Sequence, residues 1–216
     1  IIFSSTAAAY GNPSNNESIT EDEILNPLNP YGESKVKTEE YLLSNKDKYN
    51  SIILRYFNVA GADPKLRSGL ISDTPTHLIK ILSEVVVGKR EKISIFGNDY
   101  DTKDGTGIRD YIHVMDLADA HCAALNFLNR SKKNNSFCLI ANLGTGSGYS
   151  VLELINQFHK STNIKIPYQF KAKRIGDIDI SFADPSLACN ILSWKAKRGL
   201  DEMCSSSWHA AQLSKH

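Results

Sequence analysis

Three short apolar runs, separated by long polar segments, constrain the fold of this chain more than any other feature. They are residues 1–5, 51–57 and 138–143. Apolar runs of this length, bounded by polar residues, are typical of buried parallel strands. Pro30, a residue favoured at the first helical position, opens a predicted helix that continues to about Asn45. Strand, helix and strand in this order predict a βαβ unit, and therefore an α/β fold built on a parallel sheet.

The first of these runs stands at the very start of the chain. A buried strand needs neighbours on both sides, and the sequence supplies candidates only after residue 5. We therefore expect this chain to be the C-terminal part of a longer protein. With 216 residues and 41% hydrophobic content, the chain can still bury a sizeable core, in one large domain or two small ones.

Charge and cysteine patterns exclude several classes of function. The net charge is +1 and the charged residues are interspersed, so we predict neither a nucleic-acid partner nor a membrane surface. No apolar run reaches the length of about 18 residues that a transmembrane helix needs. The four cysteines form no CxxC pair and have no histidine at metal-ligand spacing, which favours reduced thiols in a cytoplasmic protein.

The acidic loop that follows Phe96 raises the question of a calcium site. Counted from Asp99, its sixth position is Asp104, where a calcium loop needs glycine, and its twelfth is Asp110, where the loop needs glutamate. The loop therefore fails the calcium pattern, and we predict no metal site.

A tyrosine and a lysine stand four residues apart on the first predicted helix. Tyr31 and Lys35 should lie one turn apart on the same face. An ammonium held close to a phenol favours the phenolate, which is the form that can act as a base. The same spacing also occurs by chance on solvated helix faces. A catalytic role for the pair therefore depends on partners from other parts of the chain.

The third apolar run leads into the glycine-rich segment 144–148. Glycines between a strand and a helix are how dinucleotide phosphates are held, so this segment is a candidate cofactor loop. Its GxGxG spacing differs from GxGxxG, and no acidic residue ends a clear second strand about twenty positions later. Ser150 and Glu153 have instead the spacing of a capping box for the next helix. We favour a structural turn over a phosphate site.

The segment after Phe57 changes character and predicts a second lobe. Thr74 and Pro75 are predicted as the N-cap and first residue of a helix whose apolar positions include Leu78. A last helix is expected from Leu200 to about Leu213.

Six motifs occur in a fixed order along nearly the whole chain. They are FSSTAAAYG (3–11), NPYGESK (29–35), LRYFN (54–58), IFGNDY (95–100), IRDYIHVMDLADAH (108–121) and NLGTGSGYSV (142–151). In this combination the chain closely resembles the UDP-glucose 4-epimerases, a family of extended short-chain dehydrogenases/reductases. The resemblance implies the C-terminal part of a Rossmann-like doubly wound parallel sheet, together with a smaller mixed α/β substrate-binding lobe.

The resemblance also implies a division into two domains. Residues 1–58 would be the remaining part of an incomplete NAD-binding Rossmann domain. Residues 59–216 would be mainly the substrate-binding domain, with about 112–145 returning to the Rossmann sheet. The family's glycine-rich pyrophosphate loop would precede residue 1. We therefore expect little or no activity from these 216 residues alone.

The activity implied is the reversible epimerisation of UDP-glucose and UDP-galactose at C4, in galactose metabolism. Hydride would pass transiently to bound NAD through a 4-keto intermediate, in a protein that is a homodimer when full length. Tyr31 would be the base and Lys35 its cationic partner. Thr6 would hydrogen-bond the C4 oxygen and relay the proton, although a strand-end hydroxyl can also simply bond the backbone.

Further contacts are implied by the same motif matches. The expected cofactor-binding residues are Ser4, Ser5, Tyr31, Lys35 and Tyr56. The expected substrate-binding residues are Thr6, Asn58, Leu78, Phe96, Arg109, Arg174, Asp177 and Ser181. The two arginines match positions that contact the diphosphate, which needs cations, and Asp177 matches an acid near the ribose.

Substrate choice and two other functions remain open. The position of Ser181 gates the sugar pocket in the family, and a small residue there leaves room for an N-acetyl group, so UDP-N-acetylhexosamines are further candidate substrates. A nucleotide-sugar 4,6-dehydratase would carry an acidic pair where this chain has Ala7 and Ala8. A catalytically silent fragment or binding module is the alternative of a different class.

Overall fold

A three-stranded parallel sheet forms one part of the molecule. The computed structural model describes residues 1–70, 72, 75–131 and 136–213. The sheet consists of β1 (Ile2–Thr6), β2 (Ser51–Tyr56) and β6 (Cys138–Leu143), in the order β1-β2-β6. Its strands lie in register, so that their carboxyl ends meet at one edge of the sheet. The three apolar runs therefore form strands, as predicted, and the α/β fold class is confirmed.

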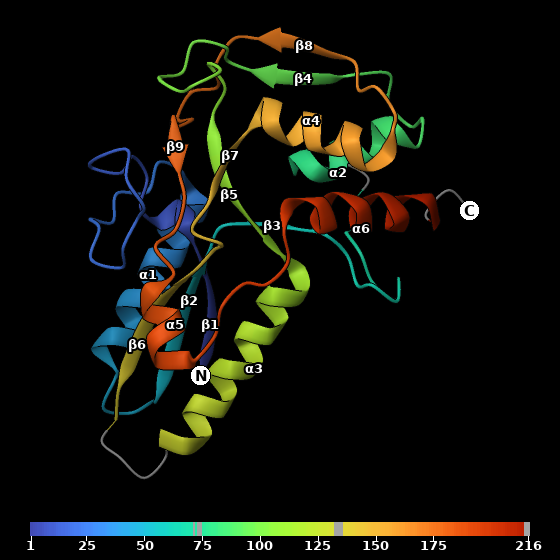
Figure 1. Cartoon of the computed structure of the whole chain (residues 1–216). Coiled ribbons are helices and arrows are strands. Elements are labelled where there is room, and N and C mark those ends of the chain that lie inside the picture. The colour runs from blue at the N-terminus through green and yellow to red at the C-terminus, as the bar shows by residue number, and fades with distance from the viewer. Residues whose placement is uncertain (71, 73–74, 132–135, 214–216) are drawn as a thin grey trace.

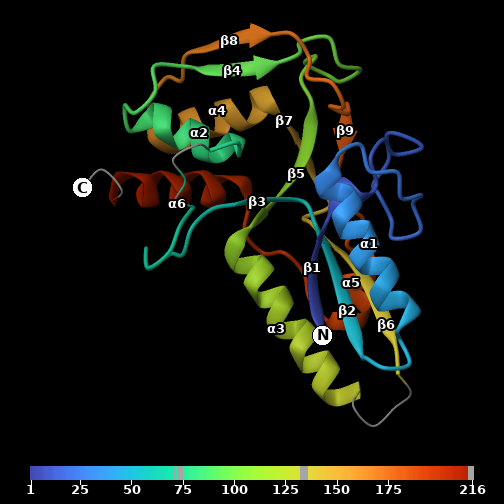
Figure 2. The same ribbon diagram turned by 180° about the vertical axis from the view of Figure 1, so that it is seen from behind.

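Helices flank this sheet. Figure 2 shows α1 (Pro30–Ser44) and α3 (Val114–Ser131) on either side of β1 and β2. The small α5 (Ser186–Leu192) packs with α3 in one apolar cluster that also contains buried residues of β2 and β6. Asn29 caps α1 through its side-chain oxygen, which accepts a hydrogen bond of 2.9 Å from the backbone of Gly32. The predicted helix start at Pro30 is therefore confirmed.

The second part of the molecule is a mixed α/β lobe around a central strand. That strand, β5 (Ile108–His113), pairs in parallel with β3 (Asn58–Ala60) and β9 (Ile180–Ser181), and antiparallel with β7 (Gly148–Ser150). Figure 1 shows the helices of this lobe stacked beyond β5, beneath a separate two-stranded sheet. The helices are α2 (Leu78–Val86), α4 (Val151–Thr162) and α6 (Leu200–Leu213), and the small sheet pairs β4 (Ile93–Phe96) with β8 (Tyr168–Lys171).

Two predicted helix starts have different outcomes. The capping box before α4 is confirmed, with Ser150 and Glu153 exchanging backbone-to-side-chain bonds of 3.0 and 2.9 Å. The predicted start at Pro75 is wrong: α2 begins at Leu78 after His77, and Thr74 lies outside the described residues. The buried apolar face of α2 begins only at Ile79, so packing supports the helix from that point.

Within the described ranges, no helix is both long enough and apolar enough to cross a lipid bilayer.

Replacing Ser150 by alanine should lower the free energy of unfolding by about 1–2 kcal/mol, because it removes the N-cap of α4. The same hydroxyl also donates to Asp104 at 2.5 Å, which places the effect toward the upper end. Urea unfolding measures the change. Ser147→Ala is the control, because this exposed serine lies in the preceding turn and caps no helix. An equal loss in both variants would contradict the capping role.

Candidate functional site

Two adjacent cavities lie where the parallel sheet meets the second lobe. Their volumes are about 500 Å³ and about 200 Å³. Asn58, Arg109 and Asp177 line both of them, so the cavities form neighbouring compartments of one elongated site. An elongated site with a polar junction suits a ligand of two unlike ends joined by a charged group.

The smaller cavity opens at the carboxyl edge of the parallel sheet. Thr6 and Tyr56 line it from the last positions of β1 and β2, which are paired with each other in the sheet. Ligands of α/β proteins bind at this edge. The Thr6 hydroxyl accepts a bond of 3.2 Å from the backbone of Ala8, as the local alternative predicted. A hydroxyl keeps its own hydrogen to donate, so Thr6 can still bond a ligand oxygen.

The Tyr31 and Lys35 side chains share one face of α1, as the four-residue spacing predicts. The Lys35 ammonium lies 5.6 Å from the centre of the Tyr31 ring and donates a bond of 2.9 Å to the backbone oxygen of Ser4. Tyr31 is 53% exposed. Neither residue is among the described residues that line the cavities, but Asn29, which caps their helix, lines the smaller one. The pair therefore lies beside the smaller cavity, with Tyr31 exposed and Lys35 half-buried.

The two serines of β1 differ in their surroundings. The Ser4 hydroxyl lies 3.2 Å from the His121 ring nitrogen Nε2, and its backbone oxygen holds Lys35. Ser5 is fully buried and donates its hydroxyl to Glu39. Alternation along the strand directs the Ser5 side chain at α1, and a cofactor-binding role for Ser5 stays a prediction.

A buried polar network behind β1 was missed by the sequence reading. The Arg55 guanidinium donates to the Glu39 carboxylate at 2.5 Å and to the Tyr10 hydroxyl at 3.0 Å. The Tyr10 hydroxyl in turn donates to Asn142 at 2.6 Å. The sequence feature that could have indicated this network is Arg55 inside an otherwise apolar strand. A buried cation requires an anionic partner elsewhere in the chain.

The position of Tyr10 in this network affects the protonation of its hydroxyl. Burial raises the pKa of Tyr10 to about 12, although the neighbouring Arg55 cation acts in the opposite direction. A phenol with this pKa stays protonated at neutral pH and cannot accept a proton.

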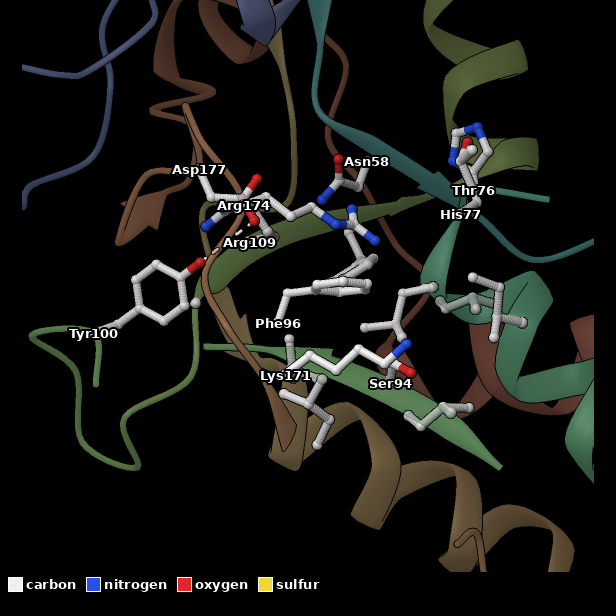
Figure 3. A pocket seen from close by; sticks show the side chains of 18 of the residues that line it. Asn58, Thr76, His77, Ser94, Phe96, Tyr100, Arg109, Lys171, Arg174 and Asp177 are labelled. Atoms are coloured by element: carbon white, nitrogen blue, oxygen red, sulfur yellow. Dashed lines mark hydrogen bonds between the residues drawn. The ribbon is translucent and has the colours of Figure 1, made fainter. Parts of the chain in front are cut away.

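The larger cavity gathers two arginines at its junction with the smaller one. In Figure 3, Asn58, Arg109, Arg174 and Asp177 lie together on one side of Phe96. The Arg174 guanidinium lies 3.7 Å from the centre of the Phe96 ring. Two cationic forks beside a carboxamide suit a diphosphate, because guanidinium groups bind phosphate oxygens in pairs.

The acidic side of this junction is held by an aromatic residue. Tyr100 donates its hydroxyl to the Asp177 carboxylate at 3.3 Å. Burial, and then the negative charge of Asp177, raise the pKa of Tyr100, so its hydroxyl remains a hydrogen-bond donor. This bond orients Asp177 on the cavity wall.

All eight predicted substrate-binding residues line one or both of these cavities. Those that line the larger one are Asn58, Leu78, Phe96, Arg109, Arg174 and Asp177. Those that line the smaller one are Thr6, Asn58, Arg109, Asp177 and Ser181, beside the predicted cofactor residue Tyr56. The sequence analysis missed His77, Ser94 and Lys171, which also line the larger cavity. These three residues belong to none of the six motifs, and only the folded structure brings them to the cavity.

The glycine-rich turn after β6 serves the protein itself. Backbone N–H groups of Thr145 and Gly146 donate to the buried carboxylate of Asp110 at 2.9 to 3.0 Å. A side chain at Gly144 would collide with the same carboxylate. The predicted structural turn is confirmed, because its backbone N–H groups already donate to the Asp110 carboxylate.

Comparison with known proteins gives one consistent group of relatives. The family model described as "GDP-mannose 4,6 dehydratase" matches residues 1–207. A UDP-glucose 4-epimerase of Bacillus subtilis is 48% identical over 96% of this chain and 61% of its own length. The chain therefore spans about three fifths of the length of this curated relative.

Solved structures agree with the sequence relatives. The UDP-glucose 4-epimerase of Stenotrophomonas maltophila, with bound NAD and formylated UDP-arabinopyranose, has a TM-score of 0.93 at 39% identity, covering 99% of this chain and 63% of that one. The UDP-Glc/GlcNAc 4-epimerase of Campylobacter jejuni has a TM-score of 0.77 at 41% identity, covering 98% and 64%.

Proposed function

The chain belongs to the extended short-chain dehydrogenase/reductase family whose model is described as GDP-mannose 4,6 dehydratase, and from this premise we propose an NAD-dependent UDP-glucose 4-epimerase. The observation that supports this most strongly is the pair of cavities that share Arg109, Asn58 and Asp177. A UDP-hexose would place its diphosphate at this junction, its nucleoside in the larger cavity and its hexose in the smaller one. The hexose would then lie beside Thr6 and the start of the Tyr31 helix.

The residues around the smaller cavity supply proton transfer. Tyr31 acts as the base that removes the proton of the C4 hydroxyl, and the Lys35 ammonium stabilises the phenolate form that accepts this proton. Thr6 bonds the same oxygen and relays the proton between substrate and tyrosine. Bound NAD would supply the acceptor and donor of the C4 hydride, which would make the overall reaction redox-neutral.

The described residues fit one end of this cofactor. Lys35 holds its ammonium against the Ser4 carbonyl at the edge of the sheet, where a ribose hydroxyl could be bonded. The turn at 144–148 does not fit the pyrophosphate, because its amides donate to Asp110. We therefore assign Tyr31, Lys35 and Tyr56 to the nicotinamide end.

The dehydratase alternative finds little support in the site. Ala7 and Ala8 line the smaller cavity from the short 3-10 helix η1 (Ala7–Ala9). Two methyl groups cannot provide the acid and base that eliminate water across C5 and C6.

Product analysis tests the proposed reaction. The intact protein, loaded with NAD and given UDP-glucose, should form UDP-galactose, which chromatography resolves from the substrate. A 4-keto-6-deoxy sugar as product would show a dehydratase. Tight UDP binding with no product would show the binding module.

A Ser181→Tyr variant tests a wider substrate range. Ser181 lines the smaller cavity and pairs with Arg109 across β9 and β5, so we propose that the site also accepts UDP-N-acetylglucosamine. The larger side chain should lower the activity on the N-acetyl substrate about tenfold relative to UDP-glucose, because it fills the space for the acetyl group. Ser181→Ala is the control and should keep the ratio of the two activities. An unchanged ratio in Ser181→Tyr would contradict the proposal.

Three further properties follow from the same assignment. We propose a role in galactose metabolism, a cytoplasmic location and a homodimeric state for the intact protein. Light scattering coupled to size-exclusion chromatography measures the last of these directly.

A further inference from the structure

One buried carboxylate links the walls of the two cavities. Asp110 is fully buried on β5, directly after Arg109. Three backbone N–H groups and one hydroxyl donate to it. They are Thr145 N at 2.9 Å, Gly146 N at 3.0 Å, Ala183 N at 3.2 Å and Thr145 Oγ1 at 2.7 Å. A buried carboxylate needs such donors, so this side chain has a defined set of partners.

These donors belong to two segments that lie far from β5 in the sequence. Thr145 and Gly146 form the turn after β6, and Ala183 follows β9. Gly144 leaves the space that the carboxylate occupies, because a side chain there would collide with it. Asp110 therefore joins three segments at one point.

The segment that leads to Ala183 contains several polar residues that line the two cavities. Arg174, Asp177 and Ser181 all precede Ala183 on it, and Ser181 lies opposite Arg109 on β5. The β5–β9 pairing that aligns them is only two residues long. Backbone bonds from Ile108 to Asp179, and between Ile19 and residues 182 and 184, also hold this segment. The bond from Ala183 to Asp110 ties it to the strand that carries Arg109.

We propose that Asp110 is a positioning residue, which sets the segment 174–183 against Arg109 and thereby controls affinity for the nucleotide diphosphate. This inference rests on the proposed nucleotide-sugar function. Asp110 is not a ligand contact, since it faces the turn amides and does not line either cavity among the described residues. It acts only through the alignment of other groups.

An Asp110→Asn variant of the intact protein, loaded with NAD, tests this role. The donors are divided between the two carboxylate oxygens, so asparagine would keep one acceptor and place its NH₂ group against the donors of the other. The dissociation constant for UDP, measured by calorimetry, should rise about tenfold. The KM for UDP-glucose should rise in parallel, with kcat at saturation within about twofold of the wild type, because only uniform binding is lost.

The matched control is Asp116→Asn. Asp116 is also almost fully buried and accepts bonds from the backbone of Lys197 and Arg198 and from the Arg198 guanidinium, but it lies on α3 outside both cavity walls. Its variant should lose comparable stability while keeping the UDP affinity. Equal weakening of UDP binding in both variants would overturn the positioning role, because general destabilisation would then explain it.

A second variant and a second measurement cover the case in which Asp110→Asn does not fold. Thr145→Val removes one donor and keeps the carboxylate, and should raise the UDP dissociation constant about twofold to threefold. Hydrogen exchange of residues 177–184 should be faster in this variant than in Asp116→Asn. Unchanged exchange would overturn the inference even if UDP did not bind, and a wild type that fails to bind UDP would count only against the proposed function.

Discussion

Replacing Tyr31 by phenylalanine should lower kcat for epimerisation by at least about a hundredfold, because general-base catalysis contributes about 10²–10⁴-fold. The variant loses only the hydroxyl of a side chain that is 53% exposed, so its melting temperature should remain close to that of the wild type. The rate of UDP-galactose formation from UDP-glucose measures the effect.

Tyr41→Phe is the matched control for this prediction. Tyr41 lies on the same helix and is 57% exposed, so the same chemical change occurs without a role in the site. Its kcat should equal that of the wild type. Full activity in Tyr31→Phe would assign the base to another group and leave Lys35 as a solvated cation.

Removal of the Glu39 carboxylate should have the largest effect on stability. Glu39→Ala leaves the Arg55 guanidinium, which is 2% exposed, without its buried anionic partner, and it also frees the Ser5 hydroxyl. Breaking a buried pair in this way costs about 3–5 kcal/mol of the free energy of unfolding. Urea unfolding, followed by circular dichroism, measures the loss.

Glu40→Ala provides the control, because this neighbouring glutamate is exposed. Its variant should differ from the wild type by no more than about 0.5 kcal/mol. Comparable losses in the two variants would contradict the buried pair. Glu39 also stands four residues after Lys35, on the same helix face, so its bonds to β1 and β2 hold the face of α1 that carries Tyr31 and Lys35.

Local features of the sequence determined the strands and the helix starts that depend only on residues close together in the chain. The apolar runs at 51–57 and 138–143 form strands, as predicted. A short continuous apolar run is enough to indicate a buried parallel strand. Pro30 and the Ser150–Glu153 box fixed two helix starts, because a cap is formed by residues three positions apart. The spacing of the glycines also sufficed to separate the turn at 144–148 from a phosphate loop.

The ordered motifs predicted the family and several of the residues that line the two cavities, but not the contacts that hold these residues in place. Ser181 was selected by its alignment with the family and Arg109 by its motif position, and their pairing across two strands appeared only in the fold. Ser5 was also selected by its motif position, and the strand directs its hydroxyl at Glu39. A motif shows which residue types occur together, but it does not show in which direction each side chain points.

Only the tertiary structure decided which buried charges meet. Glu39 and Arg55 are separated by 16 residues, and Asp110 is separated from Ala183 by 73. Such pairs have no periodic pattern in the sequence, because their partners are brought together by the crossing of whole elements. Burial makes each partner obligatory, since an unpaired charge or amide in the core is costly. The sequence alone thus determined the strands, the capped helix starts and the candidate chemistry, and the packing of the sheet against the second lobe decided how the site is held together.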